Sequence, residues 1–253
     1  MKLRMSFSIL AVASGLCAGS AWAGEGAPHW TYEGHGGPGE WGKLASDFAA
    51  CEVGKDQSPV DITGAIPAKL GPVKVSYQSQ PLTVLNNGHT LQVNFKPGNS
   101  IQFEGERYEL LQYHFHTPSE HAYGGAKAPM EVHLVHKGVT SGKLTVLGVM
   151  MVVGKANPLV QAVWDAAPAE AGPAKDFAGV SLNPAALLPA KLDYYRYEGS
   201  LTTPPCSEVV HWVNLKQTIT VSQAQIDAFA KLFPMNARPL QPLNRRFILD
   251  SAK

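Results

Sequence analysis

Short runs of alternating or β-branched apolar residues recur along most of the chain. Side chains in a β-strand point alternately to two faces, so runs of this kind are typical of strands. The pattern predicts strands over residues 73–77, 82–85, 91–95, 107–116, 131–136, 144–152 and 209–215. Asn87 and Gly88 have the turn chemistry of a hairpin between the second and third of these strands. Much of the predicted sheet is therefore antiparallel.

Helical periodicity is confined to two short segments. The first begins with Asn157 as N-cap and Pro158 at the first helical position, and the second begins at Ser222. Each segment has one apolar stripe to bury, made of Leu159, Val160, Val163 and Trp164 in the first and of Ile226, Phe229, Ala230 and Phe233 in the second. Four prolines between the two segments predict irregular surface chain, namely Pro168, Pro173, Pro184 and Pro189.

The composition fits one globular domain. The chain has 253 residues, of which 45% are hydrophobic and 16% charged, and no repeat, low-complexity segment or linker divides it. The formal net charge is +1 and no basic stripe is present, so nucleic acid is not expected as a partner. Downstream of the N-terminus no apolar stretch approaches the ~20 residues that span a bilayer, so membrane insertion is not expected.

The N-terminal residues have the pattern of an export signal. Lys2 and Arg4 precede the apolar residues 7–13, and Ala21 and Ala23 form a small-x-small cleavage site. We therefore predict a signal peptide over residues 1–23 and a mature domain over residues 24–253, located in the periplasm or secreted. Loss of Lys2 and Arg4 reduces the 21 basic side chains to 19 against 20 acidic ones, so the mature protein is nearly neutral.

Two of the three cysteines, Cys51 and Cys206, remain after removal of the signal peptide. Exposed thiols do not persist in an oxidising compartment, which favours one disulfide over two free thiols. A bridge that closes a loop of this length contributes ~4 to 5 kcal/mol in the chain-entropy description. Cys17 lies within the signal peptide and lacks the neighbouring residues of a lipidation signal.

Five of the nine histidines cluster in two adjacent predicted strands and the turn between them. His114 and His116 are two residues apart, so they project from the same face of a strand. Glu131, His133 and Val135 likewise share one face of the next strand. If the two strands are neighbours, a third imidazole joins the first two.

Three neutral imidazoles with one open position describe a catalytic zinc site, whereas structural zinc sites are closed by four protein ligands that usually include cysteine. The alternative is that the alternating histidines form the polar face of a half-exposed strand. Gln112 precedes His114 by one pleat and Glu131 precedes His133 by one pleat, so each strand carries an acceptor that can orient its histidine. This arrangement favours the metal site.

Several separated motifs of the chain resemble those of one enzyme family. They read QYHFHTPSEH from Gln112, EVHLVH from Glu131 and GSLTTPPC from Gly199, together with HWTYEG from His29, QSPVDI from Gln57, LNNGH ending at His89 and NARPLQP from Asn236. Taken in their order along the chain, these motifs resemble those of the α-class carbonic anhydrases of the exported bacterial kind. The resemblance covers essentially all of the mature chain.

The resemblance implies a mainly β, single-domain fold with a large, mostly antiparallel twisted central β-sheet and a few short surface helices. It implies a Zn²⁺ cofactor held by His114, His116 and His133. It also implies three partners behind these ligands, namely Gln112, Glu131 and the backbone carbonyl of Asn236, and a Cys51–Cys206 disulfide. His121 and His136 are left outside the metal shell as hydrogen-bonded structural residues.

The family's reaction is the interconversion of carbon dioxide and bicarbonate by attack of zinc-bound hydroxide. This hydroxide is available at neutral pH because zinc lowers the pKa of its bound water to ≈ 7, a property for which carbonic anhydrases are themselves the standard example. By resemblance, the Thr202 hydroxyl accepts a hydrogen bond from this hydroxide and donates its own proton to Glu120. The apolar wall beside it is expected to consist of Val135, Val146, Leu201 and Trp212.

The resemblance also assigns a polar side and a water path. Thr203 and Gln92 are expected on the polar side, and Tyr32 and Asn87 on the water path, with His89 as a proton relay. Strand alternation alone instead places His89 on the face of Leu91 and Val93, which favours a structural role for His89, so both roles stay open. The expected partners are carbon dioxide and bicarbonate, and a homodimer stays open.

Two other functions are compatible with a three-histidine site. One is a catalytically inactive, carbonic-anhydrase-like zinc-binding protein, although such proteins usually lose a ligand histidine and all three are present here. The other is a periplasmic zinc carrier, which has no need of Thr202, Glu120 and an apolar wall. A zinc protease is disfavoured because the chain has no HExxH motif.

Overall fold

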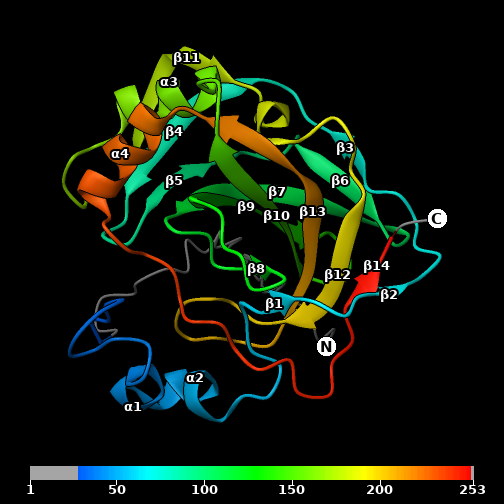
Figure 1. Cartoon of the computed structure of the whole chain (residues 1–253). Coiled ribbons are helices and arrows are strands. Elements are labelled where there is room, and N and C mark those ends of the chain that lie inside the picture. The colour runs from blue at the N-terminus through cyan, green and yellow to red at the C-terminus, as the bar shows by residue number, and fades with distance from the viewer. Residues whose placement is uncertain (1–27, 252–253) are drawn as a thin grey trace, which may run out of the picture.

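A twelve-stranded twisted sheet runs through the molecule (Figure 1). The computed structural model describes residues 28–251, so the predicted signal peptide lies outside the described residues. The strands follow the order β11-β4-β5-β7-β9-β10-β13-β12-β14-β2, with β6 pairing with β7 and with β3. A separate two-stranded sheet joins β1 and β8.

The longest strands form the middle of the sheet, namely β7 (Glu106–His116), β9 (Met130–Gly138), β10 (Leu144–Val153) and β13 (Val210–Val221). The others are β1 (Asp61–Ile62), β2 (Ile66–Pro67), β3 (Lys74–Ser76), β4 (Gln80–Asn86), β5 (Leu91–Asn94), β6 (Ser100–Phe103), β8 (Ala122–Tyr123), β11 (Lys175–Leu182), β12 (Tyr194–Gly199) and β14 (Leu249–Asp250). Most neighbours are antiparallel, as predicted, while β10–β13 and β14–β2 are parallel pairs within the large sheet. The predicted β4–β5 hairpin is present, and Gly88 has a φ of +87° in its turn.

The two predicted helices are α3 (Pro158–Ala166) and α4 (Gln223–Leu232). Asn157 accepts hydrogen bonds from the backbone N–H groups of Leu159 and Val160, and Ser222 forms a capping box with Gln225. Both helices bury apolar residues against one face of the sheet, although Trp164 and Ala230 stay partly exposed. No helix in the stretch from residue 28 to 251 is both long and apolar enough to cross a membrane.

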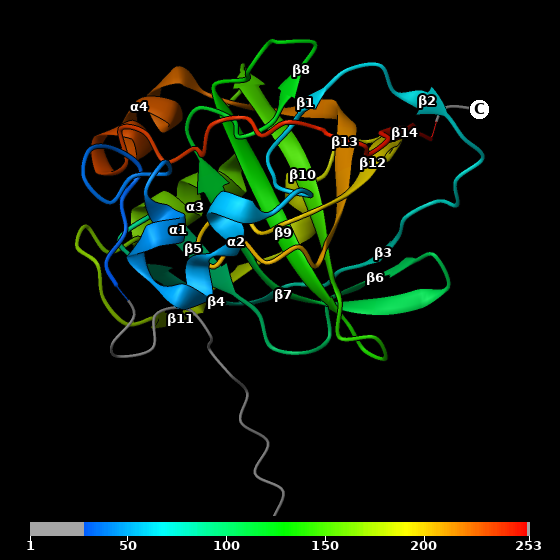
Figure 2. The same cartoon turned by 90° about the horizontal axis from the view of Figure 1, so that it is seen from below.

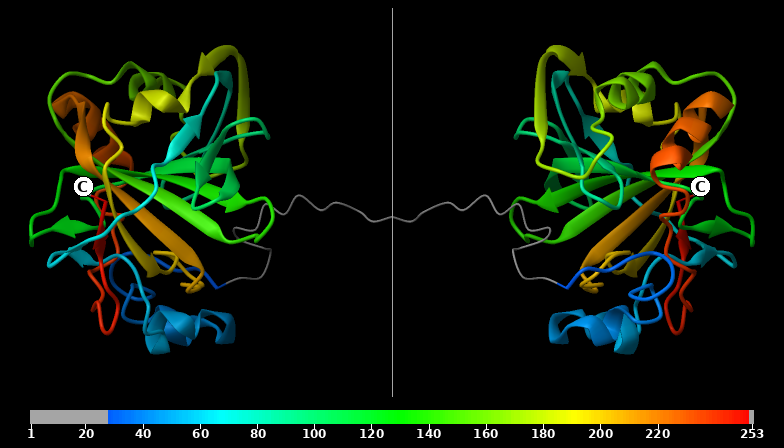
Figure 3. Two further views of the ribbon diagram at one scale, coloured as in Figure 1. Left: turned by 90° about the vertical axis from the view of Figure 1, so that its right-hand side faces the viewer. Right: turned by 90° about the vertical axis from the view of Figure 1, so that its left-hand side faces the viewer.

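The helices α1 (Trp41–Leu44) and α2 (Ala50–Val53) lie on the other side of the sheet from α3 and α4 (Figures 2 and 3). With the 3₁₀ turn η1 (Ser46–Phe48), they are too short to give a helical periodicity in the sequence. A second 3₁₀ turn, η2 (Pro184–Leu187), begins at one of the four prolines.

The expectation of irregular chain between Pro168 and Pro189 was wrong, because this segment contains the edge strand β11. All eight side chains of β11 are exposed or only partly buried, so the strand lacks the apolar alternation that marks the others. Its backbone pairs with β4 across a register shift between Phe177 and Ser181. The strand is therefore formed by its backbone pairing with β4, which the pattern of hydrophobic residues does not reveal.

Strand β9 is covered on both faces, and eight of its nine residues are buried. Met130, Val132 and Leu134 face the core under α3 and α4. Val135 lies in a second apolar cluster together with Val146, Tyr197, Val210 and Trp212. The alternation of β9 therefore separates a purely structural face from a face that carries Glu131 and His133.

Candidate metal centre

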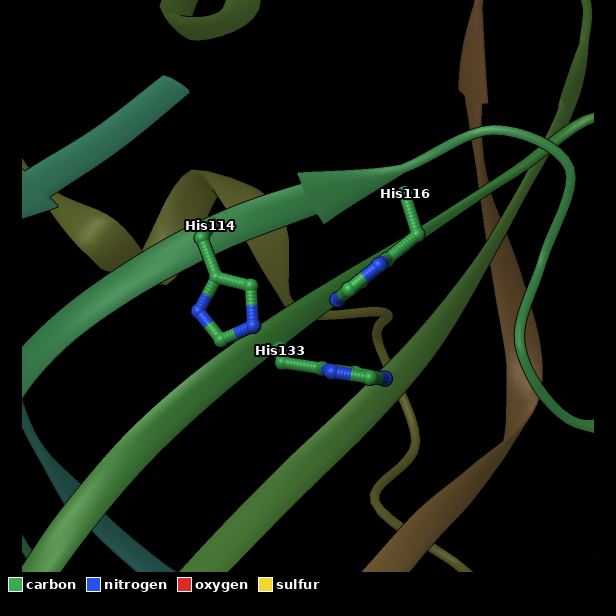
Figure 4. Close-up of side chains that lie close together, drawn as sticks. All are labelled: His114, His116 and His133. Atoms are coloured by element: carbon green, nitrogen blue, oxygen red, sulfur yellow. The ribbon is translucent and has the colours of Figure 1, made fainter. Parts of the chain in front are cut away.

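Three histidine rings converge on one point of the sheet (Figure 4). His114 and His116 extend from the end of β7, and His133 extends from the neighbouring strand β9, directly opposite His114 in the pairing register. One nitrogen atom from each ring lies within 4.8 Å of the others. The expected adjacency of the two strands is therefore present, and it brings the third imidazole to the first two.

Each ring also has one nitrogen that bonds to an acceptor behind it. The distances are 2.8 Å from His114 Nδ1 to Gln112 Oε1, 2.7 Å from His116 Nδ1 to the Asn236 carbonyl oxygen and 2.9 Å from His133 Nε2 to Glu131 Oε1. An acceptor at these positions requires an N–H on the ring, so the opposite nitrogen of a neutral imidazole carries a lone pair. The inward-facing nitrogens are His114 Nε2, His116 Nε2 and His133 Nδ1.

Glu120 lies beside these inward-facing nitrogens. Its Oε1 accepts from the backbone N–H of Arg238 at 2.9 Å, while its Oε2 lies 3.5 Å from His116 Nε2 and 3.8 Å from His133 Nδ1. His116 and His133 are each 1% exposed and Glu120 is fully buried, and neither His116 Nε2 nor Glu120 Oε2 has a hydrogen-bond partner within residues 28–251. Buried lone pairs that face a carboxylate oxygen fit a cation and are costly without one.

Burial also favours the neutral form of His114 and His116. It lowers the pKa of His114 well below the ordinary value of a histidine, and the neighbouring His116 and His133 lower it further. Burial also lowers the pKa of His116, although Glu120 opposes this effect. Neutral imidazoles are the form that ligates zinc, and three nitrogen donors without cysteine match a catalytic site, so the residues fit a Zn²⁺ ion.

Glu131 joins the centre to a second buried histidine. Its Oε1 also lies 2.8 Å from His121 Nδ1, and its Oε2 accepts the backbone N–H groups of Glu120 and His121 at 2.8 and 2.9 Å. Burial alone raises the pKa of Glu131, but His121 and His133 together hold it well below its usual range. The carboxylate is therefore ionised and bonded on both oxygens.

The two histidines that were left outside the metal shell have both ring nitrogens engaged. His121 Nε2 lies 2.6 Å from the Tyr197 hydroxyl, opposite its bond to Glu131. His136 lies on the core-facing side of β9, where its Nε2 is 2.5 Å from the Tyr77 hydroxyl and its Nδ1 is 3.3 Å from the Thr145 carbonyl oxygen. Their placement agrees with structural roles.

A pocket of about 600 Å³ opens above the three histidines. All the residues expected to form the apolar wall, the polar side and the water path line this pocket, as does Thr202. They are Val135, Val146, Leu201, Trp212, Thr203, Gln92, Tyr32, Asn87 and His89. Sequence reasoning missed Trp30, Phe48 and Val210, which line the pocket too. Trp30 lies within the HWTYEG motif, so that motif contained the signal for it, whereas Phe48 belongs to the 3₁₀ turn that no periodicity marks.

Thr202 lies in the loop between β12 and β13 and is 6% exposed at the pocket wall. This loop is tied down by the Cys51–Cys206 disulfide, whose Cα atoms are 5.0 Å apart, and by a 2.9 Å bond from the Cys206 N–H to the Thr203 carbonyl. The expected disulfide is thus present. The expected hydrogen bond from the Thr202 hydroxyl to Glu120 is not formed in this structure: in the part of the chain that the structure describes, Glu120 Oε2 has no hydrogen-bond partner and Oε1 accepts from the Arg238 N–H.

His89 lines the pocket and stacks on the indole of Trp30. Burial, assisted by the neighbouring His29, lowers the pKa of His89 to about 4. Leu91 and Val93 belong to the core on the opposite side of the sheet, so the packing that strict alternation predicts for His89 is not observed. The hairpin turn changes the alternation, because the His89 N–H bonds to Asn87 Oδ1 at 2.9 Å.

Comparison with known proteins gives a consistent result. A family model described as eukaryotic-type carbonic anhydrase matches residues 36–252. The chain is 45% identical over 223 residues to a carbonic anhydrase of Pectobacterium carotovorum, covering 87% of this chain and 90% of that protein. It is 43% identical over 248 residues to a carbonic anhydrase of Pectobacterium atrosepticum, covering 98% and 100%. An α-carbonic anhydrase structure from Thermovibrio ammonificans with the inhibitor sulfanilamide superimposes with a TM-score of 0.85 at 44% identity, covering 88% of this chain and 100% of that one.

Proposed function

The chain belongs to the α-carbonic anhydrase family, whose activity is the zinc-dependent hydration of carbon dioxide, and from this premise we propose that His114, His116 and His133 hold the zinc ion. The observation that carries the proposal is the set of three converging ring nitrogens, each left free by a hydrogen bond on the far side of its ring. When bound, zinc lowers the pKa of water to about 7 and so supplies a nucleophile at neutral pH.

The residues behind the ligands hold each imidazole in one tautomer and one orientation. Gln112, Glu131 and the Asn236 carbonyl each accept the outer N–H of one ligand histidine, which keeps the inner nitrogen unprotonated and aimed inward. Asn236 is itself fixed, because its side-chain amide donates to the His89 and Phe115 carbonyls at 2.9 Å each. The orientation of the three imidazoles is therefore fixed by hydrogen bonds within the protein.

Thr202 has the role of aiming the nucleophile. Its hydroxyl lies at the pocket wall, and Glu120 Oε2 is the buried acceptor that remains free for its proton. A hydroxyl that gives its only proton to a carboxylate can then act toward the site only as an acceptor. Such a residue selects ligands that donate a hydrogen bond.

The pocket wall suits a small apolar substrate. Val135, Val146, Leu201 and Trp212 supply apolar surface beside the three histidines, and Thr203 and Gln92 supply polar groups on the same pocket. Carbon dioxide carries no charge for a cationic clamp to hold, so an apolar wall is the appropriate binding surface. Bicarbonate is the product in the hydration direction and the substrate in the reverse one.

The proton produced by hydration has to leave the pocket. Tyr32, Asn87 and His89 line this pocket, and Asn87 Nδ2 is 3.4 Å from Gln92 Oε1. Turnover above ~10³ per second needs a group that passes the proton to buffer, because direct loss to water from a group of pKa ~7 is limited by reprotonation. His89 is the imidazole at this position, and we assign the relay to it.

Export supplies the oxidising compartment in which the disulfide forms. Residues 1–23 have the composition of a cleaved signal peptide, and the Cys51–Cys206 bridge is typical of periplasmic or secreted proteins. N-terminal sequencing of the exported protein tests this step, with Gly24 as the expected first residue.

The decisive experiment combines metal analysis with stopped-flow carbon dioxide hydration. Purified mature protein is expected to contain one zinc per chain and to hydrate carbon dioxide, to lose activity on chelation and to regain it with zinc. A protein that holds zinc without hydration activity would instead be a carrier or an inactive binding protein. A protein that neither holds zinc nor regains activity with it would refute the proposed site.

A further inference from the structure

A row of side-chain positions crosses the sheet from the metal centre to a buried asparagine. The pairing register places His133 of β9 opposite Gly148 of β10, and Gly148 beside Asn214 of β13. Val146 and Trp212, two residues earlier on β10 and β13, both line the pocket, so Gly148 and Asn214 lie on the same face of the sheet. Asn214 is thus two strands away from a zinc ligand, on the side of the sheet that carries the site.

Asn214 is a costly residue at this place. It is 1% exposed, and neither its Oδ1 nor its Nδ2 has a hydrogen-bond partner among the described residues. Burying an amide without partners costs free energy that an apolar side chain of the same size does not. The presence of a buried polar side chain without hydrogen-bond partners therefore requires a specific explanation.

Gly148 shows what the amide faces. A Cβ atom built on Gly148 lies 3.0 Å from Glu131 Oε1 and 3.4 Å from both Cγ and Oδ1 of Asn214. The Glu131 carboxylate and the Asn214 amide therefore both lie over Gly148. A side chain at position 148 would occupy the space between them. Rotation of the amide by 180° about χ2 turns its NH₂ group to this side and breaks no hydrogen bond, because neither amide atom has one.

We propose that Asn214 is a positioning residue of the metal centre, whose NH₂ group faces the Glu131 carboxylate over Gly148 and supports the Glu131–His133 hydrogen bond. The inference rests on the proposed zinc site. Glu131 is buried and ionised, so an amide dipole aimed at it stabilises its charge where water cannot. Through the bond from His133 Nε2 to Glu131, this stabilisation holds the zinc ligand in its orientation.

The test measures zinc affinity and stability separately. Asn214→Leu keeps the approximate size of the side chain and removes its donor. We expect zinc affinity, measured by competition with a chromophoric chelator, to fall about 10-fold. We expect Tm, measured with excess chelator present, not to rise, because the stabilisation of the Glu131 charge is lost together with the buried amide. Asn214→Val is the second variant, chosen because a β-branched residue suits the strand, and the same direction is expected.

Tyr113→Phe is the matched control. Tyr113 is fully buried, and its hydroxyl also has no hydrogen-bond partner among the residues that the structure describes. It lies next to His114 in sequence but packs in the core against Phe95 and Phe115. Its removal is expected to raise Tm by about 2–4 °C, because an unpartnered hydroxyl is lost, and to leave zinc affinity unchanged. A merely structural role for Asn214 predicts the same result for both positions.

A Glu131→Gln background shows whether Asn214 acts through Glu131. Asn214→Leu is expected to cause no further loss of zinc affinity there. An additional 10-fold loss in that background, or zinc affinity within twofold of wild type in the Leu or Val single variant, overturns the inference. A wild-type protein that binds no zinc overturns the proposed function instead, so the two failures are distinguishable.

Discussion

The indole ring of Trp30 lies flat on the imidazole ring of His89, with the ring centroids 3.7 Å apart and an angle of 8° between the planes. This stack buries the imidazole, and burial, followed by the effect of His29, lowers the pKa of His89 to about 4. Proton transfer from a group of pKa ~7 to such an acceptor is uphill. For the relay role proposed for His89, the imidazole has to leave Trp30, and we expect the stack to control how often it does so.

Replacement of Trp30 by alanine tests this relationship. The variant exposes His89, so the pKa of His89 is expected to rise toward 6.5, as followed by NMR titration of the imidazole. In dilute buffer at neutral pH kcat is expected to rise, while kcat/KM stays unchanged because Trp30 is not one of the residues proposed to bind carbon dioxide. His89→Ala is the control and should lower kcat by about tenfold or more, with rescue by imidazole buffer. A pKa that stays near 4 in the Trp30 variant would exclude the stack as its cause.

Removal of one ligand tests the metal centre. His116→Ala leaves two ring nitrogens, so zinc affinity is expected to fall by orders of magnitude and hydration to cease, with the sheet intact by circular dichroism. Glu131→Ala is the graded comparison and should weaken affinity or activity only about 10 to 100-fold, because Glu131 orients a ligand without being one. Equal losses in the two variants would make Glu131 a ligand.

The central sheet was predictable because its strands are long and buried. Strand β9 has apolar residues on its core-facing side, so alternation marks it even though its other face carries His133, and strand β10 is marked by a nearly continuous apolar run. Strand β11 escaped prediction because its side chains are exposed, and β12, with its mixed YYRYEG sequence, lacks a regular alternation. The parallel pairing of β10 with β13 joins segments far apart in the chain, and neither segment's own pattern specifies it.

The convergence of the three histidines was predictable for a local reason, whereas the residues of the pocket were predicted only through the resemblance. His114 and His116 share a face by strand geometry alone, and Glu131 and His133 do the same on the next strand. Asn236 contributes a backbone carbonyl from 120 residues after His116, which no spacing rule can find. The Trp30–His89 stack likewise joins distant segments, so the low pKa of His89 was not foreseeable from the sequence.

Thr202→Ala tests the aiming of the nucleophile. Zinc affinity is expected to stay near the wild-type value, because Thr202 bonds to no ligand histidine. We expect kcat/KM for hydration to fall about 10²-fold, since misorientation of a reacting group costs about this much. Thr203→Ala, at the adjacent position of the same pocket, serves as the control and should have the smaller effect. Wild-type kcat/KM in the Thr202 variant would remove Thr202 from the mechanism.

Cys51→Ser tests the bridge that anchors the Thr202 loop. The disulfide spans 155 residues, so its loss is expected to cost about 4 to 5 kcal/mol of unfolding free energy in the chain-entropy description. A fall in kcat/KM should accompany this loss, because Cys206 lies four residues after Thr202. Urea unfolding and hydration kinetics measure the two effects, and reduced wild-type protein should behave as the variant does. Two reactive thiols in the native exported protein would contradict the bridge.

His136 makes stability depend on pH in a defined window. Burial lowers its pKa to about 4 in the folded protein, against 6.5 for an ordinary histidine. Between these values the unfolded chain binds a proton at His136 and the folded chain does not, so unfolding free energy falls as pH falls from 6.5 to 4 and is unaffected by this residue above pH 6.5. The full loss is roughly 3 kcal/mol for a shift of this size. His136→Asn removes the titration, so the difference in unfolding free energy between wild type and variant, measured by urea unfolding at pH 7, 6 and 5 with excess chelator present, should shrink as pH falls. A difference that stays constant over this range would show that His136 is not the titrating group.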